Sequence, residues 1–223
     1  LSEHPDIFTA KKELHYFGSD LESRFHDLTP ANYLRYFETE KRYKLYGESS
    51  VWYLYTQNAA REIYEYNPQV KIIIMLRDPV EMLPSLHAQF LYNGDETIQF
   101  FPKALKQDTE RSKAGRKLPT VNYTNRPSFF DACSYYEPVK RFLGIFGNER
   151  VLILLNEDLR DNFSETFRRV LNFLEADTGF VPKDIKLNSR KKMRSIALHH
   201  LSKAAPETYK RVFRFAVPSR KMR

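Results

Sequence analysis

The sequence predicts an α/β fold in which helices flank a parallel central sheet. Two short segments, Ile72–Leu76 and Arg150–Leu155, contain unbroken apolar runs that are too short for a typical helix. Such runs indicate strands that are buried on both faces, as in parallel sheets. Helical segments separate these strands along the chain, and that alternation favours crossover connections within one parallel sheet.

Several elements precede the first apolar run. Thr29 and Pro30 begin a helix that runs to about Glu38, since an N-cap threonine and a proline at the first position both favour a helix start. Tyr43–Gly47 is interpreted as a short strand that ends at a glycine. Tyr53–Tyr66 has an amphipathic helical pattern and stops ahead of the next proline, because the residue before a proline disfavours the helical conformation.

The first apolar run leads into a helix and then into the most polar part of the chain. Asp78 can cap a helix over Pro79–Tyr92, and Asp95–Ala114 reads as a charged helix. A loop with a proline towards each side follows over Gly115–Asp131. Because residues 95–131 are the least core-like stretch, we expect them to form a lid or a substrate edge.

The last third of the chain contains two helices and a basic segment. Tyr136–Phe146 and Phe163–Leu174 have helical patterns and flank the second strand. Residues 183–223 are expected to form a basic helical segment, with six lysines and arginines between 183 and 194. Such a run is typical of a solvated face, and contact with a phosphate-bearing ligand is the alternative. We expect one domain over residues 1–223.

Composition limits the possible partners. Lys and Arg number 36 against 28 Asp and Glu, which gives a net charge of +8 and a pI near 9.4. A basic chain suits anionic partners such as nucleotides, nucleic acids, sulfated substrates or anionic membranes, without choosing among them. Cys133 is the single cysteine, so neither a disulfide nor a thiol-based metal site is possible, and we expect a structural thiol. The histidines show no metal-ligand spacing, and no apolar run approaches a membrane span.

Arg77 marks a candidate anion site. It follows the strand Ile72–Leu76 directly, and the capped start of the next helix comes immediately after it. Ligands of open α/β sheets bind at the carboxyl ends of the strands. A guanidinium group beside a helix N-terminus favours phosphate or sulfate. The alternative is a simple ion pair between Arg77 and Asp78 or a nearby glutamate.

Four motifs stand in the order and spacing of one enzyme family. They are His4–Asp6 with Lys12–Phe17 (H-P-D…(K/N)-E-x-H-(F/Y)-F), Tyr46–Tyr53 (E-K-(T/S)-x-x-Y), Leu76–Glu81 with Ser85 (L-R-(D/N)-P-x-x-R-x-x-S), and Phe142–Leu159. On these motifs the chain resembles sulfotransferases that depend on 3′-phosphoadenosine 5′-phosphosulfate (PAPS), most closely the heparan-sulfate type and its bacterial relatives. The resemblance covers roughly residues 1–175.

The resemblance implies a P-loop-NTPase-like fold and transfer of a sulfuryl group from PAPS to a hydroxyl or amine acceptor. Arg77 and Ser85 would bind the 3′-phosphate of the nucleotide, both in PAPS and in the product adenosine 3′,5′-bisphosphate. Glu13 would be the general base that removes the acceptor proton, and His15 would orient Glu13 or contact the acceptor. The acceptor is expected to be a carbohydrate or a small molecule.

The chain departs from the family pattern at several positions. The K-x-G-T-(T/S) loop for the 5′-phosphosulfate would precede His4, so we expect a chain truncated at its N-terminus. Ser49 replaces the usual lysine, Met82 replaces a frequent arginine, and Pro84 stands immediately before the phosphate-binding serine. A proline there could kink the helix and weaken the Ser85 contact. Asn188–Lys192 occupies the zone of the family's closing Lys/Arg-Gly loop but lacks the glycine, so Arg190–Arg194 are weak candidates.

Two other functions fit parts of the sequence. A nucleotide kinase would require a G-x-x-x-x-G-K-(S/T) loop, which does not occur in the chain. A non-catalytic basic module that binds nucleic acid or a polyanionic glycan fits the charge, but no nucleic-acid motif is present. We therefore expect neither nucleic acid nor membrane as a partner, and the oligomeric state is left open. The expected location is the cytoplasm, with the Golgi lumen as the alternative.

Overall fold

The computed structural model describes residues 1–10, 13–21, 28–114 and 127–182. Within these residues, β3 (Ile72–Leu76) and β4 (Val151–Leu155) pair in parallel, in register from first residue to last. A second parallel pair joins β1 (Ile7–Thr9) to β2 (Leu45–Gly47). The prediction of an α/β fold with parallel strands and crossover connections is confirmed, whereas β1 was not predicted.

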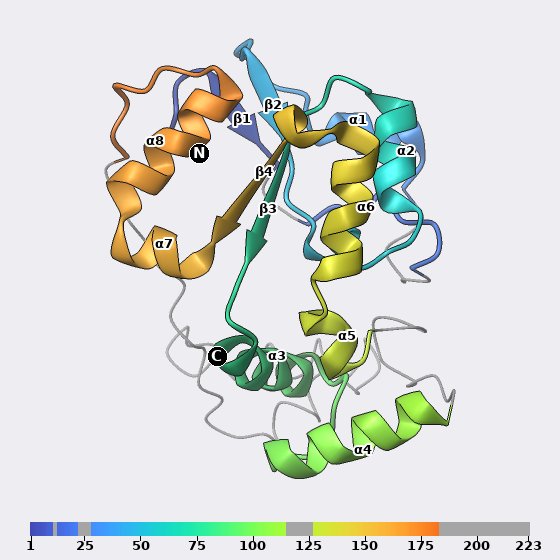
Figure 1. The fold of residues 1–223 in the computed structure, drawn as a ribbon. Helices are drawn as coiled ribbons and strands as arrows, with labels where there is room; N and C mark the ends of the chain where they lie inside the picture. The colour runs from blue at the N-terminus through green and yellow to red at the C-terminus, as the bar shows by residue number, and fades with distance from the viewer. Residues whose placement is uncertain (11–12, 22–27, 115–126, 183–223) are drawn as a thin grey trace, which may run out of the picture.

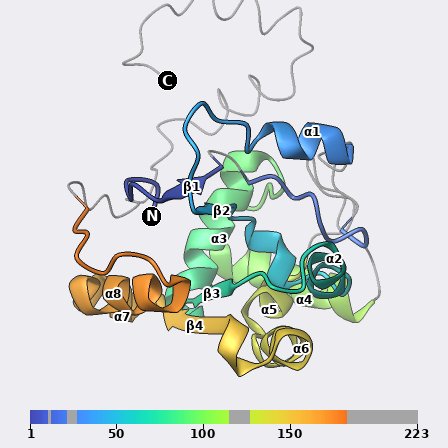
Figure 2. The same cartoon turned by 90° about the horizontal axis from the view of Figure 1, so that it is seen from above.

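Helices cover the β3–β4 sheet from two sides. In Figures 1 and 2 the sheet lies between α7 (Asn156–Asp161) and α8 (Phe163–Leu174) on one side and α6 (Tyr136–Phe146) on the other. α2 (Ala59–Tyr66) packs against α6. The carboxyl end of β3 leads into α3 (Pro79–Asn93), so the residues between β3 and α3 lie at the edge where ligands of such sheets bind.

Three more helices complete the described chain. α1 (Pro30–Arg35) precedes β2, while α4 (Phe101–Lys113) and α5 (Phe129–Cys133) lie with α3 beyond the carboxyl end of β3 (Figure 1). Two short 3₁₀ turns, η1 (Val51–Leu54) and η2 (Asn148–Arg150), stand before α2 and β4. Trp52, Phe90 and Phe129 fill the core between η1, α3 and α5.

The main hydrophobic core lies between the β3–β4 sheet, α2 and α6. Its buried members include Ala59, Ile63, Ile74, Phe142, Phe146 and Val151. Leu14 and Phe17, from the segment that carries Glu13 and His15, are buried in the same core. Burial of a side chain of this size contributes about 1.5–3 kcal/mol relative to exposure. The segment around Glu13 is therefore anchored on the sheet and its helices.

Local capping signals predicted the starts of α1 and α3. Thr29 Oγ1 accepts a hydrogen bond from Asn32 N at the start of α1, and Asp78 Oδ1 accepts one from Val80 N at the start of α3. The predicted bounds of α6 and α8 match the structure. α1 ends at Arg35 rather than near Glu38.

The helix predicted over Tyr53–Tyr66 is wrong in its first half. The chain forms η1 and then turns before α2 begins at Ala59. Asp20 causes the late start, because its carboxylate accepts hydrogen bonds from Gln57 N at 2.7 Å and Asn58 N at 3.1 Å. Thr56 Oγ1 also accepts a hydrogen bond from Ala59 N at 3.1 Å, a local cap that the sequence reasoning did not use.

The polar stretch also differs from the prediction. In Asp95–Ala114 the helix begins only at Phe101, and Asp95 and Glu96 are buried in the turn that precedes it. α5 begins inside the predicted loop Gly115–Asp131, where Ser128 and Asp131 form a reciprocal capping box. Residues 115–126 and the basic segment 183–223 lie outside the described residues, so those parts of the prediction are not tested.

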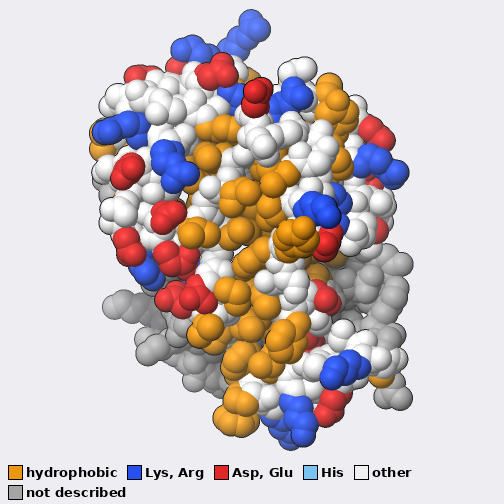
Figure 3. All heavy atoms as spheres, viewed as in Figure 1, with side chains coloured by type: hydrophobic (Ala, Val, Ile, Leu, Met, Phe, Trp, Pro, Cys, Tyr) orange, Lys and Arg blue, Asp and Glu red, His pale blue; other side chains and the backbone are white. Residues whose placement is uncertain are grey.

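The expectation that both strands are buried on both faces is wrong at their carboxyl ends. Ile74 is buried, but Met75 is 47% exposed and Leu155 is 46% exposed. In Figure 3, hydrophobic side chains run across the middle of this face, over the sheet and the helices beside it. No helix among the described residues is long and apolar enough to cross a membrane.

Candidate functional site

Arg77 lies at the carboxyl end of β3, as predicted, and its guanidinium group is only partly paired. Nη1 lies 3.4 Å from Ser85 Oγ and Nη2 lies 3.2 Å from Glu81 Oε2. Nε is buried and has no hydrogen-bond partner in the described part of the chain. Because a buried donor without a partner is costly, this guanidinium retains unfilled capacity for an anion.

Ser85 lies one turn beyond Glu81 on α3, facing the same guanidinium. Its hydroxyl donates to the Glu81 carbonyl at 3.2 Å, which leaves its lone pairs available to donors such as Arg77. Pro84 does not end α3, which continues to Asn93. The structure therefore brings Arg77 and Ser85 together in spite of the proline.

Glu81 is the carboxylate that competes for Arg77. The Arg77–Glu81 pair spans one helical turn at a partly exposed site, and Arg160 Nη1 of α7 lies 3.6 Å from the other carboxylate oxygen. The alternative of an ion pair with a nearby glutamate is thus realised through Glu81, not Asp78. Exposed pairs of this kind contribute only about 0.3–0.5 kcal/mol. A phosphate group, which binds a guanidinium in bidentate fashion, can displace such a partner.

A tyrosine fixes the backbone of Arg77. Tyr135, which immediately precedes α6, donates from its hydroxyl to the Arg77 carbonyl at 2.8 Å. Burial raises the pKa of Tyr135, so the hydroxyl remains a donor. Tyr55, just after η1, donates to the Ala132 carbonyl of α5 at 2.5 Å. These two hydroxyls attach the α5–α6 connection to both η1 and the end of β3.

Glu13 and His15 form the second predicted pair. His15 Nε2 lies 3.1 Å from Glu13 Oε2, and their side chains are 5% and 49% exposed. The buried imidazole therefore holds a carboxylate that solvent and a substrate can reach. His15 has a φ of +48°, in the left-handed region, so the backbone is not extended at this residue.

The two pairs occupy separate clusters. Glu13 is paired with His15, whereas Arg77 contacts Ser85 and Glu81. Ser50 and Tyr53 are positions of the E-K-(T/S)-x-x-Y motif, but the sequence did not show that they contact the backbone around His15, and sequence reasoning missed Tyr135, which contacts the backbone of Arg77. Each of the three acts on a residue far away in the sequence, so no local signal indicates the contact.

The other expected features have structural roles. Trp52 is buried and stacks on Phe90 with a ring separation of 6.3 Å, so it is a core residue. Burial raises the pKa of the Cys133 thiol, and its sulfur donates to the Phe130 carbonyl at 3.3 Å. A higher thiol pKa disfavours the thiolate that a nucleophile would need. Ser49, which stands at the lysine position of the motif, is exposed.

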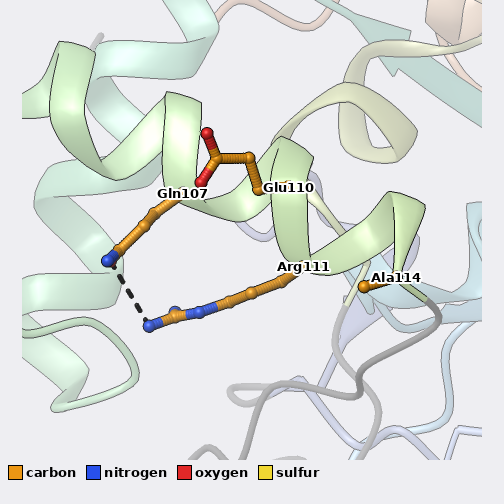
Figure 4. A pocket seen from close by; sticks show the side chains of 4 residues that line it. All are labelled: Gln107, Glu110, Arg111 and Ala114. Atoms are coloured by element: carbon orange, nitrogen blue, oxygen red, sulfur yellow. Dashed lines mark hydrogen bonds between the residues drawn. The ribbon is translucent and has the colours of Figure 1, made fainter.

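A shallow hollow occurs on α4, away from both clusters. It has a volume of about 340 Å³ and is lined by Gln107, Glu110, Arg111 and Ala114. Figure 4 shows these side chains on one stretch of the helix, with Arg111 hydrogen-bonded to Gln107 at 3.4 Å. It contains none of the candidate site residues, although it belongs to the segment expected to form a lid or a substrate edge.

Comparison with known proteins places the chain in a family. A family model described as "Sulfotransferase domain" matches residues 29–215, a range that includes Arg77 and Ser85 and begins after Glu13 and His15. Carbohydrate sulfotransferase 15 of Mus musculus is 30% identical over 119 residues, which cover 50% of this chain and 21% of the relative. The Homo sapiens protein of the same name is 29% identical over 119 residues, again 50% and 21%.

The likeness extends to a solved structure. A crystal structure of a sulfotransferase from Alicyclobacillus acidocaldarius superposes with a TM-score of 0.69 at 27% identity, covering 84% of this chain and 78% of that one. The chain spans about a fifth of the length of the curated relatives it matches, 21% in each case. The family model covers well over half of the chain, and the fold agrees with that of the solved relative. The chain belongs to the sulfotransferase family.

Proposed function

We propose that this chain transfers a sulfuryl group from PAPS to a hydroxyl or amine of a carbohydrate acceptor. Membership in the sulfotransferase family supports sulfuryl transfer as the reaction class. The observation that carries the choice of donor is the Arg77 guanidinium at the end of β3, beside Ser85 and with a buried Nε that no described group satisfies. The names of the curated relatives support a carbohydrate acceptor.

The residues at the end of β3 fit the 3′-phosphate of such a nucleotide. Arg77 offers a planar fork of donors and Ser85 offers a hydroxyl on the same side, which suits a tetrahedral anion. Glu81 would give up its contact with Arg77 and keep the one with Arg160. AMP lacks this phosphate, so Arg77 and Ser85 would distinguish the two nucleotides.

Two features of Glu13 support a role as the general base. Its carboxylate is half exposed, and the buried His15 ring restricts where it can point. Glu13 would take the proton of the acceptor group while the acceptor atom bonds to sulfur, and the proton would then reside on Glu13. PAPS supplies the sulfuryl group, and the bond between sulfur and the 5′-phosphate oxygen breaks with its electron pair leaving on that oxygen.

The test is a transfer assay with radiolabelled PAPS and a panel of carbohydrate acceptors. Glu13→Gln should lower kcat by a factor of about 10² or more, since general base catalysis contributes about 10²–10⁴. Its affinity for adenosine 3′,5′-bisphosphate should stay within about twofold of the parent, because the two clusters are separate. Glu65→Gln removes a more exposed glutamate of α2 and serves as the control. Full activity in Glu13→Gln would exclude it as the base.

The cytoplasm remains the proposed location, with the Golgi lumen as the alternative. The finding that no described helix could span a membrane does not distinguish the two. Fractionation of cells that express the protein at its natural level distinguishes them, since the proposal predicts recovery in the cytosolic fraction. Recovery with Golgi membranes would establish the alternative.

A further inference from the structure

The backbone of Leu14–Phe17 is held by side-chain hydroxyls instead of by a helix or a strand. Its four successive N–H groups donate to two oxygens. The first two donate to Ser50 Oγ at 3.0 Å each. The next two donate to Tyr53 Oη, at 2.9 and 3.3 Å. Ser50 stands at the start of η1 without capping it, because its side chain turns to these amides instead.

Both hydroxyls donate their own protons to a single carboxylate, that of Glu48. Ser50 Oγ lies 2.7 Å from Glu48 Oε2, and Tyr53 Oη lies 2.8 Å from Oε1. Tyr33 Oη is a third donor, 3.0 Å from Oε1. A hydroxyl has one proton and two lone pairs, so each of the two relaying hydroxyls uses its full capacity.

The direction of these hydroxyl protons determines whether the segment is held. When each hydroxyl donates its proton in a hydrogen bond to Glu48, both of its lone pairs face the N–H groups of Leu14–Phe17. Without an acceptor at Glu48, the proton is free to rotate towards those N–H groups, where donor faces donor. The charge of Glu48 therefore keeps two otherwise rotatable groups in one orientation.

His15 needs this support more than its neighbours do. It is buried, and its φ of +48° is in the left-handed region that a residue with a side chain rarely adopts. Such a conformation persists only where the surroundings enforce it. Ser50 accepts the N–H of His15 itself, and the ring of His15 then contacts Glu13 at 3.1 Å.

From this geometry we infer that Glu48 is a positioning residue for the Glu13–His15 pair, acting through Ser50 and Tyr53. This inference rests on the proposed function, in which Glu13 is the general base. Glu48 itself does not touch the reacting atoms. It orients the hydroxyls, the hydroxyls orient the backbone on either side of His15, and His15 orients the carboxylate of Glu13.

The protonation state of Tyr33 and Tyr53 agrees with the positioning role of Glu48. Burial first, and the neighbouring Glu48 charge second, raise the pKa of both Tyr33 and Tyr53 well above the usual range. Both hydroxyls therefore keep their protons and continue to donate throughout the physiological pH range.

The first test separates turnover from nucleotide binding. Glu48→Gln should lower kcat by about 10- to 100-fold, since a displacement of about 1 Å in a catalytic group can cost 10²-fold. The KM for PAPS and the Kd for adenosine 3′,5′-bisphosphate should change by less than about twofold, because Arg77 and Ser85 lie in the other cluster. Ser50→Ala should reproduce the loss, and Ser50→Thr, which keeps the hydroxyl, should restore most of kcat. Equal losses in kcat and nucleotide binding would contradict the inference.

The second test asks whether Glu48 acts through Glu13. In a protein that already carries Glu13→Gln, the further change Glu48→Gln should lower kcat by no more than about threefold, since residues that act as a unit are non-additive. A full additional 10- to 100-fold loss would show that Glu48 acts independently of Glu13, and would overturn the inference.

The third test distinguishes failure of this inference from failure of the proposed function. Hydrogen exchange of the Leu14–Phe17 amides should accelerate at least about tenfold in Glu48→Gln, while exchange in β3 stays unchanged. Unchanged exchange at Leu14–Phe17 would overturn the inference, whatever the activity. Absence of transfer by the parent protein would overturn the proposed function, and the exchange result would then decide alone whether Glu48 holds the segment.

Discussion

Gly18 allows a quantitative prediction about the segment that carries Glu13 and His15. Its φ is +89°, and a Cβ at this position would lie 2.6 Å from Thr56 Cγ2. Thr56 is buried, and its hydroxyl accepts the N–H of Ala59 at 3.1 Å, so the side chain cannot turn away without losing a bond at the start of α2. Gly18→Ala therefore combines backbone strain with overpacking.

Backbone strain and overpacking together determine how far the free energy of unfolding of Gly18→Ala falls. A residue with a Cβ in the left-handed region costs about 1–2 kcal/mol. Overpacking of a well-filled site typically costs about 1–3 kcal/mol. The free energy of unfolding of Gly18→Ala should thus fall by about 2–5 kcal/mol, which is a large part of the stability of a typical domain.

Urea denaturation followed by the fluorescence of Trp52, the single tryptophan, measures the change. The matched control is Gly144→Ala inside α6, where an added Cβ would have nothing within 4 Å. That variant should gain about 0.5–1 kcal/mol, because alanine is the better helix former. Adding Thr56→Ser to Gly18→Ala should recover the overpacking part and leave about 1–2 kcal/mol from the backbone. A loss below about 1 kcal/mol in Gly18→Ala would refute the reasoning.

Three further predictions follow from the contacts of the two clusters. Glu81→Gln removes the carboxylate that competes for Arg77, so calorimetry should show adenosine 3′,5′-bisphosphate binding about two- to threefold tighter; weaker binding would contradict the competition. Tyr135→Phe removes one hydrogen bond to the Arg77 carbonyl and should weaken the same binding by about fivefold, since such a bond contributes about 1 kcal/mol; unchanged binding would count against the role of this bond. The raised pKa values of Tyr33 and Tyr53 mean that their contribution to stability is complete below the usual tyrosine pKa of about 10 and is lost as the pH rises above it. Urea midpoints measured between pH 8 and pH 11 should therefore fall for the parent and fall less when both tyrosines are phenylalanine, and equal falls would contradict this assignment.

The parts of the fold that follow from local chemistry could be predicted. Asp78 and the proline after it predict the start of α3, and the isoleucine-rich run before Arg77 predicts β3 with its correct bounds. These signals lie within a few residues of the elements they control. The start of α2 was not predicted: Thr56 supplies a local cap that was not recognised, and the carboxylate of Asp20, which belongs to a different segment, accepts two further backbone N–H groups there.

In the candidate site, too, contacts between nearby residues could be predicted and contacts between distant residues could not. The family resemblance implied that Arg77 and Ser85 share one site and that His15 could orient Glu13, and contacts within both pairs are present. What the sequence did not reveal is the support of these pairs. Ser50 stands 35 positions from His15, and its hydrogen bond depends on how β2 and η1 pack against the earlier segment. Hydrogen bonds from side chains to irregular backbone form only in the folded chain, so the hydrophobic periodicity of the sequence does not indicate them.

The central claim is that Arg77 binds the 3′-phosphate of the donor nucleotide, and calorimetric titration tests it most directly. Adenosine 3′,5′-bisphosphate should bind the protein more tightly than AMP. Arg77→Ala should weaken bisphosphate binding by about 10- to 100-fold, because hydrogen bonds to charged groups contribute about 1.5–3 kcal/mol, and should leave AMP binding unchanged. Arg61→Ala is the matched control, since Arg61 also pairs with a glutamate one helical turn away. Equal binding of the two nucleotides, or an Arg77→Ala protein that still prefers the bisphosphate, would contradict the account.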